Sequence, residues 1–218
     1  MANRDLLLLG TSAGGVEALR HLARALPHDL PASVLVVIHL SSHFKSSLDA
    51  ILSGSGPLTA TFAHDGEEIR HGHIYIAPAE HHLLLDKNGR TLRLGNGPRE
   101  NNACPAIDPL FRSVALGNGH RAVGIVLTGT LGDGASGLQA LQHGGGIAVV
   151  QDPEDAAFSE MPSAALHRCR PDYVSRLADI PALIEDLVLQ VPGSPAKPSG
   201  QLRYEELERP GRRLRARG

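Results

Sequence analysis

The chain has 218 residues, enough for one large domain with a substantial core, and a formal net charge of −2. This charge excludes a strong whole-molecule attraction to nucleic acid or to an anionic membrane. The aromatic content of 3%, without tryptophan, argues against a base-stacking surface. The two cysteines, Cys104 and Cys169, lack metal-ligand or redox spacing, so we expect a cytoplasmic protein. We expect no membrane insertion, because no segment approaches about 20 consecutive apolar residues.

Apolar residues and turn signals predict an alternation of strands and helices at the start of the chain. Residues 5–9 are predicted to form a strand, and residues 14–26 an amphipathic helix that ends at Pro27. A second buried strand is predicted at 33–38, followed by a short helix at 44–53. This order is typical of the first units of a parallel α/β sheet.

The middle of the chain has a different pattern, made of short extended runs between turn signals. The extended runs are 58–63, 73–77, 81–86 and 91–94. Asp65-Gly66 and Asn88-Gly89 are turn dipeptides, and the second is flanked by apolar residues in the manner of a β-hairpin over 83–92. We therefore expect this region to be an antiparallel insert in an otherwise parallel sheet.

The α/β alternation then returns and continues almost to the end of the chain. Helices are predicted at 107–117, 134–143, 162–168 and 179–190, and strands at 122–127 and 147–150. From Gly193 the composition changes to Pro, Ser, Lys, Glu and Arg, so we expect a disordered basic tail over 193–218. The predicted fold is α/β, with a doubly wound, mainly parallel sheet and an antiparallel hairpin insert in a single domain over 1–192.

Three polar residues each follow a predicted strand of this sheet. Ser12 lies in the small-residue turn Gly10-Thr11-Ser12-Ala13-Gly14-Gly15, His39 ends the second strand, and Asp133 follows the strand at 122–127. Ligands of open α/β sheets bind at the carboxyl ends of the strands, where these three side chains would meet. A serine, a histidine base and an aspartate that orients the histidine form a nucleophilic hydrolase site.

Each of these residues also has a structural interpretation that the sequence leaves open. Ser12 fits a tight turn, a helix N-cap or a phosphate-binding loop. The dinucleotide fingerprint, however, needs glycine where Ser12 stands, and the second strand ends in His39 rather than in an acidic residue. His39 is compatible with a partly solvated strand end, and Asp133 with an Asp-Gly turn or N-cap. The Ser-His-Asp chain order also differs from that of α/β-hydrolases.

The other histidines are concentrated in the middle of the chain. They are His64, His71, His73, His81 and His82. Metal binding by His71 and His73 is conceivable, but no cysteine or carboxylate lies at ligand spacing, so we expect a solvated surface and no metal. The residues imply no cofactor.

An ordered set of motifs resembles the catalytic domain of the chemotaxis protein-glutamate methylesterases, the CheB type, over about residues 5–190. The motifs are Gly-Thr-Ser-Ala-Gly-Gly at 10–15, Val-Ile-His-Leu at 37–40, Gly-His-Ile-Tyr-Ile-Ala-Pro at 72–78, His82, Pro-Ala-Ile-Asp-Pro-Leu-Phe at 105–111, Leu-Thr-Gly at 127–129, Gly-Asp-Gly-Ala at 132–135 and Met-Pro at 161–162. The resemblance implies a Ser-His-Asp triad at Ser12, His39 and Asp133.

The implied reaction is hydrolysis of methyl esters on receptor glutamates, with glutamine deamidation in some members. The implied partner is the cytoplasmic domain of a methylated chemoreceptor or a similar signalling protein. An oxyanion in this reaction needs preorganised N–H donors, for which the amides of Ala13 and Thr130 are the candidates. His82 and Met161 lie in matched motifs and are expected in the substrate cleft.

The chain departs from the family pattern at three places. Ala13 replaces the usual Thr, Gly129-Thr130-Leu131 replaces Gly-Met-Gly, and Ala103-Cys104 replaces a His-Arg pair. A serine esterase or amidase with another substrate, and a non-catalytic receptor-binding module, are therefore the alternatives. The family's N-terminal receiver domain has no room before Asp5, so we expect a stand-alone catalytic domain that is active without phosphorylation or controlled by a regulator in trans.

Overall fold

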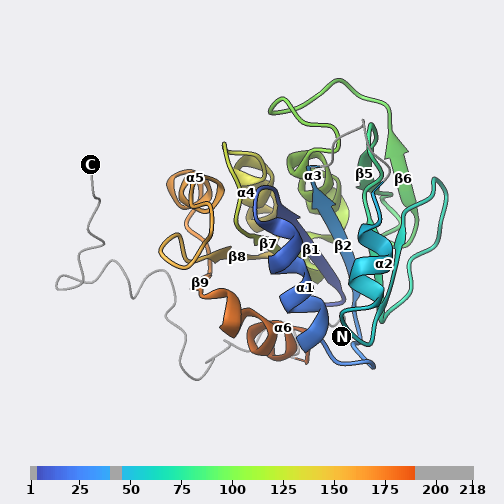
Figure 1. Cartoon of the computed structure of the whole chain (residues 1–218). Helices are drawn as coiled ribbons and strands as arrows, with labels where there is room; N and C mark the ends of the chain where they lie inside the picture. The colour runs from blue at the N-terminus through green and yellow to red at the C-terminus, as the bar shows by residue number, and fades with distance from the viewer. Residues whose placement is uncertain (1–3, 40–45, 190–218) are drawn as a thin grey trace.

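The computed structural model describes residues 4–39 and 46–189, which form a seven-stranded sheet with helices on both faces (Figure 1). The order of strands across the sheet is β3-β4-β2-β1-β7-β8-β9, and every neighbouring pair is parallel. The strands are β1 (Leu6–Thr11), β2 (Ser33–Ile38), β3 (Thr59–Phe62), β4 (His73–Ile76), β7 (Ala122–Val126), β8 (Ile147–Gln151) and β9 (Tyr173–Ser175).

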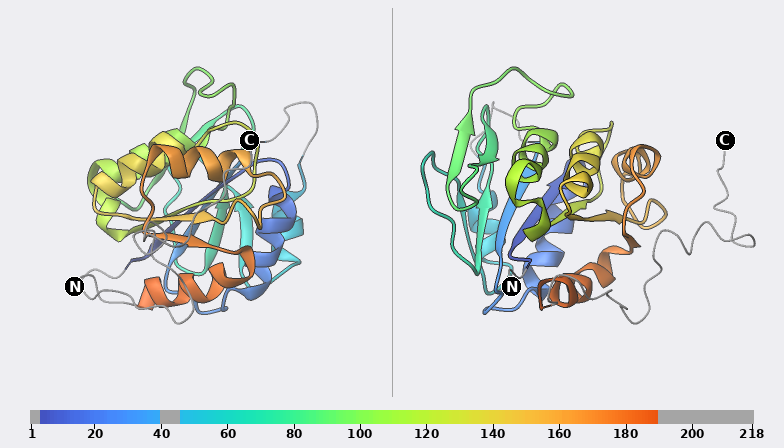
Figure 2. Two further views of the ribbon diagram at one scale, coloured as in Figure 1. Left: turned by 90° about the vertical axis from the view of Figure 1, so that its left-hand side faces the viewer. Right: turned by 180° about the vertical axis from the view of Figure 1, so that it is seen from behind.

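The central strands are buried on both faces, which explains their continuous runs of Leu, Val and Ile. Every residue of β1, β2 and β7 is buried. One face is covered by α1 (Gly15–Ala25), α2 (Leu48–Ser53) and α6 (Ile180–Leu189), and the other by α3 (Ile107–Asn118), α4 (Ala135–His143) and α5 (Glu160–Arg168). Figure 2 shows these two helical layers from the side and from behind. The predicted doubly wound α/β fold is confirmed.

The expectation for the middle of the chain is correct for the hairpin and wrong for the strands before it. β5 (His82–Leu85) and β6 (Leu92–Gly95) form a separate antiparallel pair that packs beside α3. β3 and β4, in contrast, pair in parallel with each other at one edge of the main sheet. The connection between them contains no helix, so the sequence carried no sign of a parallel crossover.

Other differences between prediction and structure are small. The three-residue strand β9 was not predicted, nor were the short 3₁₀ helices η1 (Gly119–Arg121) and η2 (Leu177–Asp179). Residues 44 and 45 of the predicted helix at 44–53, and the predicted tail at 193–218, lie outside the described residues. Within the described part of the chain, no helix is long and apolar enough to cross a membrane.

The strand order reverses beside β1, which places a topological switch point between β1 and β7. From β1 the chain proceeds through α1 to β2 on one side, whereas β7 continues through α4 to β8 on the other. A crevice forms at the carboxyl ends of strands where the winding reverses in this way. The segments that follow β1, β2 and β7 therefore meet at one place.

Candidate active site

Ser12 lies in the tight turn between β1 and α1. Its amide donates to the Thr128 carbonyl at 3.1 Å, and its own carbonyl accepts from the Gly15 amide at 2.9 Å. Gly14, the N-cap of α1, has φ of 75°, a left-handed conformation that glycine adopts without steric cost. The turn thus holds Ser12, half-buried, at the carboxyl edge of the sheet.

The structure brings His39 and Asp133 to Ser12. His39 Nδ1 lies 3.0 Å from Ser12 Oγ, and His39 Nε2 lies 2.8 Å from Asp133 Oδ2. The His39 side chain is 20% exposed, whereas that of Asp133 is 1% exposed. An unbroken hydrogen-bonded chain therefore runs from a half-buried hydroxyl through an imidazole to a buried carboxylate.

The Asp133 carboxylate accepts five hydrogen bonds. Oδ2 accepts from His39 Nε2 and from the Ile107 amide at 2.7 Å. Oδ1 accepts from Asn101 Nδ2 at 2.8 Å, and from the amides of Gly134 at 2.9 Å and Asp108 at 3.2 Å. Burial by itself would raise the pKa of Asp133, but these hydrogen bonds, led by that from His39, outweigh burial and lower the pKa.

An ionised Asp133 fixes the tautomer of a neutral His39. A carboxylate only accepts hydrogen bonds, so Nε2 of His39 carries the proton and Nδ1 presents a lone pair to Ser12 Oγ. In the trypsin-type triad Nε2 faces the serine, so the two ring nitrogens exchange roles here. Either orientation lets the imidazole accept the hydroxyl proton, which is the chemistry of an activated serine nucleophile.

The loop after β7 closes onto Ser12 at Gly129. A Cβ atom on Gly129 would lie 2.9 Å from Ser12 Cβ and would also collide with Met161 Sδ. Within the described part of the chain, the amides of Ala13 and Thr130, which flank this contact, have no hydrogen-bond acceptor. Free N–H groups on both sides of a serine are what an oxyanion requires.

Met161 and His82 support the site from beneath its surface. Met161 is fully buried, and its amide donates to the Gly129 carbonyl at 3.0 Å. His82 is also buried, with Nε2 2.9 Å from the Pro98 carbonyl and Nδ1 accepting from the Ala106 amide at 3.2 Å. Neither residue has a hydrogen bond to the Ser12–His39–Asp133 chain, so both brace the loops that surround it.

The other histidines of the middle region do not gather into a metal site. Among the described residues no group of three potential metal ligands occurs. The expectation of a solvated surface is wrong for His82 and for His73, both of which are buried. His73 lies on β4 and has Nε2 2.9 Å from Thr61 Oγ1. Burial, followed by the nearby Arg70, lowers the pKa of His73.

Two polar residues beside Asp133 were not predicted from the sequence as part of the site. Asn101 has φ of 49°, and its side chain contacts both Asp133 and Asp108. Asp108 is buried at the start of α3, and burial raises its pKa. One signal for Asp108 was present, because a carboxylate in the apolar motif at 105–111 needs partners once buried. Asn101 carried only the weaker signal of an Asn-Asn pair, which tolerates left-handed turns.

Comparison with known proteins agrees with the fold and with the motifs. The family model described as CheB methylesterase matches residues 7–184. The crystal structure of the Thermotoga maritima CheB methylesterase catalytic domain superposes with a TM-score of 0.81 at 32% identity, covering 84% of this chain and 98% of that one.

Relatives that carry the name protein-glutamate methylesterase/protein-glutamine glutaminase match most of this chain. The protein of Hydrogenovibrio crunogenus is 35% identical over 85% of this chain, and that of Salmonella typhimurium is 32% identical over 88%. The chain spans about half the length of these two relatives, 50% and 54%. A Leptospira interrogans relative, 34% identical, is covered over 93% of its own length.

The fold and the site define a class of protein: an α/β protein with a hydrogen-bonded serine, histidine and aspartate at its topological switch point. The matches agree with this class. The chain belongs to the CheB methylesterase family. The enzyme class expected from the motifs, a methylesterase among the hydrolases, is thereby confirmed.

Proposed function

We propose that this chain hydrolyses methyl esters on glutamate side chains of a methylated chemoreceptor, with Ser12 as nucleophile, His39 as general base and acid, and Asp133 as the residue that orients His39. The observation that carries the proposal is the hydrogen-bonded chain through these three residues in a member of the methylesterase family. The reaction belongs in the cytoplasm, where the cytoplasmic domain of such a receptor lies. Its catalytic unit is residues 1–192.

In the first half of the reaction Ser12 Oγ attacks the ester carbonyl carbon while His39 Nδ1 takes the hydroxyl proton. The carbonyl electron pair moves onto oxygen, and the amides of Ala13 and Thr130 donate to the resulting oxyanion. The carbon–methoxy bond then breaks, and protonated His39 gives its proton to the leaving oxygen, releasing methanol. Asp133 stabilises the imidazolium that exists between these two proton transfers.

In the second half, water attacks the acyl-enzyme and His39 accepts one of its protons. The bond between the acyl carbon and Ser12 Oγ breaks, and the proton returns to Ser12. The glutamic acid side chain is released and loses its proton to solvent, leaving a carboxylate, and the free enzyme is restored. A glutamine side chain would follow the same route with ammonia as the leaving group, which accounts for the deamidation that the relatives' names record.

The test is release of methanol from a methylated receptor cytoplasmic domain by the purified chain and by Ser12→Ala. We expect the substitution to lower turnover by about 10⁴-fold or more without unfolding the chain, because losing the nucleophile removes the covalent route. Ser55→Ala, which removes a surface hydroxyl beyond α2, is the matched control and should leave turnover unchanged. Near-normal methanol release by Ser12→Ala would refute the mechanism.

One observation favours a serine esterase with a different substrate preference as the second candidate. Leu131, at a position where the family usually has glycine, has φ of 66° and is 59% exposed on the loop between Gly129 and Asp133. Its amide donates to Glu160 Oε2 at 2.8 Å, which helps to hold this unfavourable conformation. Labelling of Ser12 by a fluorophosphonate without methanol release from the receptor would favour this candidate, and absence of labelling would favour a binding module.

A further inference from the structure

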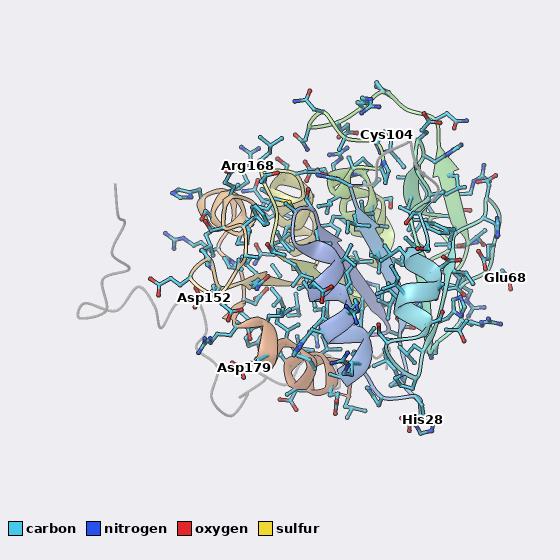
Figure 3. All side chains as sticks on the ribbon, viewed as in Figure 1. His28, Glu68, Cys104, Asp152, Arg168 and Asp179 are labelled. Atoms are coloured by element: carbon cyan, nitrogen blue, oxygen red, sulfur yellow. The ribbon has the colours of Figure 1, made fainter. Side chains whose placement is uncertain are left out.

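The segment between β6 and α3, residues 96–106, is a long loop that lies at the top of the molecule in Figure 1. Figure 3 labels Cys104 on this segment, shortly before α3 begins. The loop is held to the rest of the protein at a few points. One of them is the salt bridge between Arg112 and Glu100, whose Nη2–Oε2 distance is 2.6 Å. Asn101, an exposed residue of this segment, nonetheless has a direct connection to the buried Asp133.

That connection is made by the side-chain amide of Asn101. Its Nδ2 atom donates to Asp133 Oδ1 at 2.8 Å and to Asp108 Oδ2 at 2.9 Å. An amide nitrogen has two hydrogens, so both are used, one on each buried carboxylate. The backbone of Asn101 has φ of 49°, a left-handed conformation that asparagine tolerates better than most residues and that directs this side chain inward.

We infer that Asn101 is a positioning residue for the proposed reaction: by bridging Asp133 and Asp108 it holds the Asp133 carboxylate in the orientation that His39 requires. The inference rests on the proposed function of the Ser12–His39–Asp133 chain. Asn101 acts through Asp133, and its hydrogen bonds involve neither Ser12 nor His39.

The two oxygens of Asp133 have separate partners, which explains how this positioning works. Oδ2 accepts hydrogen bonds from His39 and the Ile107 amide. Oδ1 accepts from Asn101 and from the amides of Gly134 and Asp108. Among these donors, only His39 and Asn101 are side chains. Loss of the Asn101 amide would leave Oδ1 with backbone donors alone and would weaken the restraint that keeps Oδ2 oriented toward His39.

The bridge also holds two buried carboxyl groups side by side. Asp108 Oδ1 accepts from the Gly137 amide at 2.6 Å, while Oδ2 has Asn101 as its hydrogen-bond donor among the described residues. The other charged or titratable groups that act on the pair are His39 and Arg112. Without Asn101, Asp108 Oδ2 would lose its donor, and the buried Asp108 carboxyl would take up a proton at higher pH.

The experiment compares Asn101→Gly and Asn101→Asp with Asn102→Gly. Glycine tolerates the left-handed backbone, so Asn101→Gly removes the amide without strain, and Asn101→Asp keeps the shape but replaces the donor by a third carboxylate. Asn102 is the matched control, because it has φ of 63° and its hydrogen bond uses only its carbonyl, which accepts from Arg99 and survives in glycine.

We expect kcat to fall about tenfold to a hundredfold in Asn101→Gly, which corresponds to one hydrogen bond to a charged group, with KM unchanged. The acid limb of the kcat/KM profile should move to higher pH, because Asp133 loses a donor that favours its ionised form. Asn101→Asp should lose more activity than Asn101→Gly. Asn102→Gly should match the wild type in both kcat and pH profile.

Wild-type kcat and an unshifted pH profile in Asn101→Gly would overturn the inference. So would a loss of activity that is accompanied by a lower melting temperature but by no pH shift, because that pattern describes a structural role. If Asn101→Gly does not fold, Asn101→Asp decides by the same two readouts. A dead Ser12→Ala beside a normal Asn101→Gly would refute this inference alone, whereas an active Ser12→Ala would refute the proposed function itself.

Discussion

The loop between β7 and α4 and the start of α3 each contain a buried aspartate, and the two carboxylates differ in how many hydrogen bonds they accept. Asp133 is 1% exposed and accepts five hydrogen bonds, whereas Asp108 is 5% exposed and accepts two. The pKa of Asp133 is lowered and that of Asp108 is raised. Burial is the largest influence in both cases and acts in the same direction, so the donors decide the outcome.

This difference shows that depth in the fold does not determine the charge of a carboxylate. Asp133 is supplied with enough N–H groups to remain negative, which the orienting member of the proposed triad must do. Asp108 has too few donors for its burial, and the neighbouring charge of Asp133 raises its pKa further. The number of hydrogen-bond donors around a buried aspartate therefore indicates whether its pKa is raised or lowered, and with it the role that the residue can have near an active site.

The sharpest test of the comparison is Asp133→Asn. We expect a loss of about 10⁴ in kcat, because an amide at this position no longer stabilises the imidazolium and favours the wrong tautomer of His39. The protein should remain folded, since the change preserves the shape of the side chain. Methanol release and far-ultraviolet circular dichroism, measured on the same preparation, check both parts. A loss below tenfold would contradict the orienting role of Asp133.

The same isosteric change at the second carboxylate should have a much smaller effect. Asp108→Asn keeps an oxygen that can accept from the Gly137 amide and removes no group that contacts His39. We expect kcat to fall by about tenfold at most, which is the effect of weakening one hydrogen bond of Asn101. If Asp108→Asn were as inactive as Asp133→Asn, the two carboxylates would share one role and the comparison would fail.

The smallest expected effect is on the pH dependence of stability. A raised pKa means that the folded state binds the Asp108 proton more tightly than the unfolded state, so this group's contribution to the free energy of unfolding is lost as pH rises through the raised pKa. Asp108→Asn removes that dependence. Its stability relative to the wild type should therefore increase from about pH 4 to pH 7, as measured by urea unfolding.

Asp133 should contribute to the free energy of unfolding with the opposite pH dependence. Its lowered pKa contributes stability that is present above the ordinary aspartate pKa and is lost as pH falls through the lowered value. Asp133→Asn should therefore lose most relative to the wild type at neutral pH and less in acid. A stability difference with the same pH slope for both variants would contradict the opposite pKa directions.

The sequence predicted the site better than it predicted the loop that supports it. Ser12 and His39 could be located because each directly follows an apolar strand, and Asp133 because it lies in the loop after another such strand; the strand ends of a parallel sheet converge. Asn101 lies on a segment without periodicity, whose path is determined by tertiary contacts such as that of Glu100 with Arg112.

The same reasoning explains the errors in the fold. β3 and β4 are short strands joined without a helix, so their parallel pairing carried no local signal. β9 has three residues, too few for an alternating pattern to be recognised. Long buried strands and amphipathic helices, in contrast, were predicted with bounds close to those observed, because their burial dictates their sequence.

The turn that carries Ser12 is joined to the loop after β7 by hydrogen bonds between residues far apart in the sequence. Thr11 Oγ1 donates to the Thr128 carbonyl at 2.8 Å, a contact that spans 117 residues. While the chain is being synthesised, its N-terminal strand and turn emerge from the ribosome long before this partner does. A growing or prematurely ended chain therefore contains Ser12 without the loop that completes the site, and the proposed nucleophile can react with esters only when the protein around it is nearly complete.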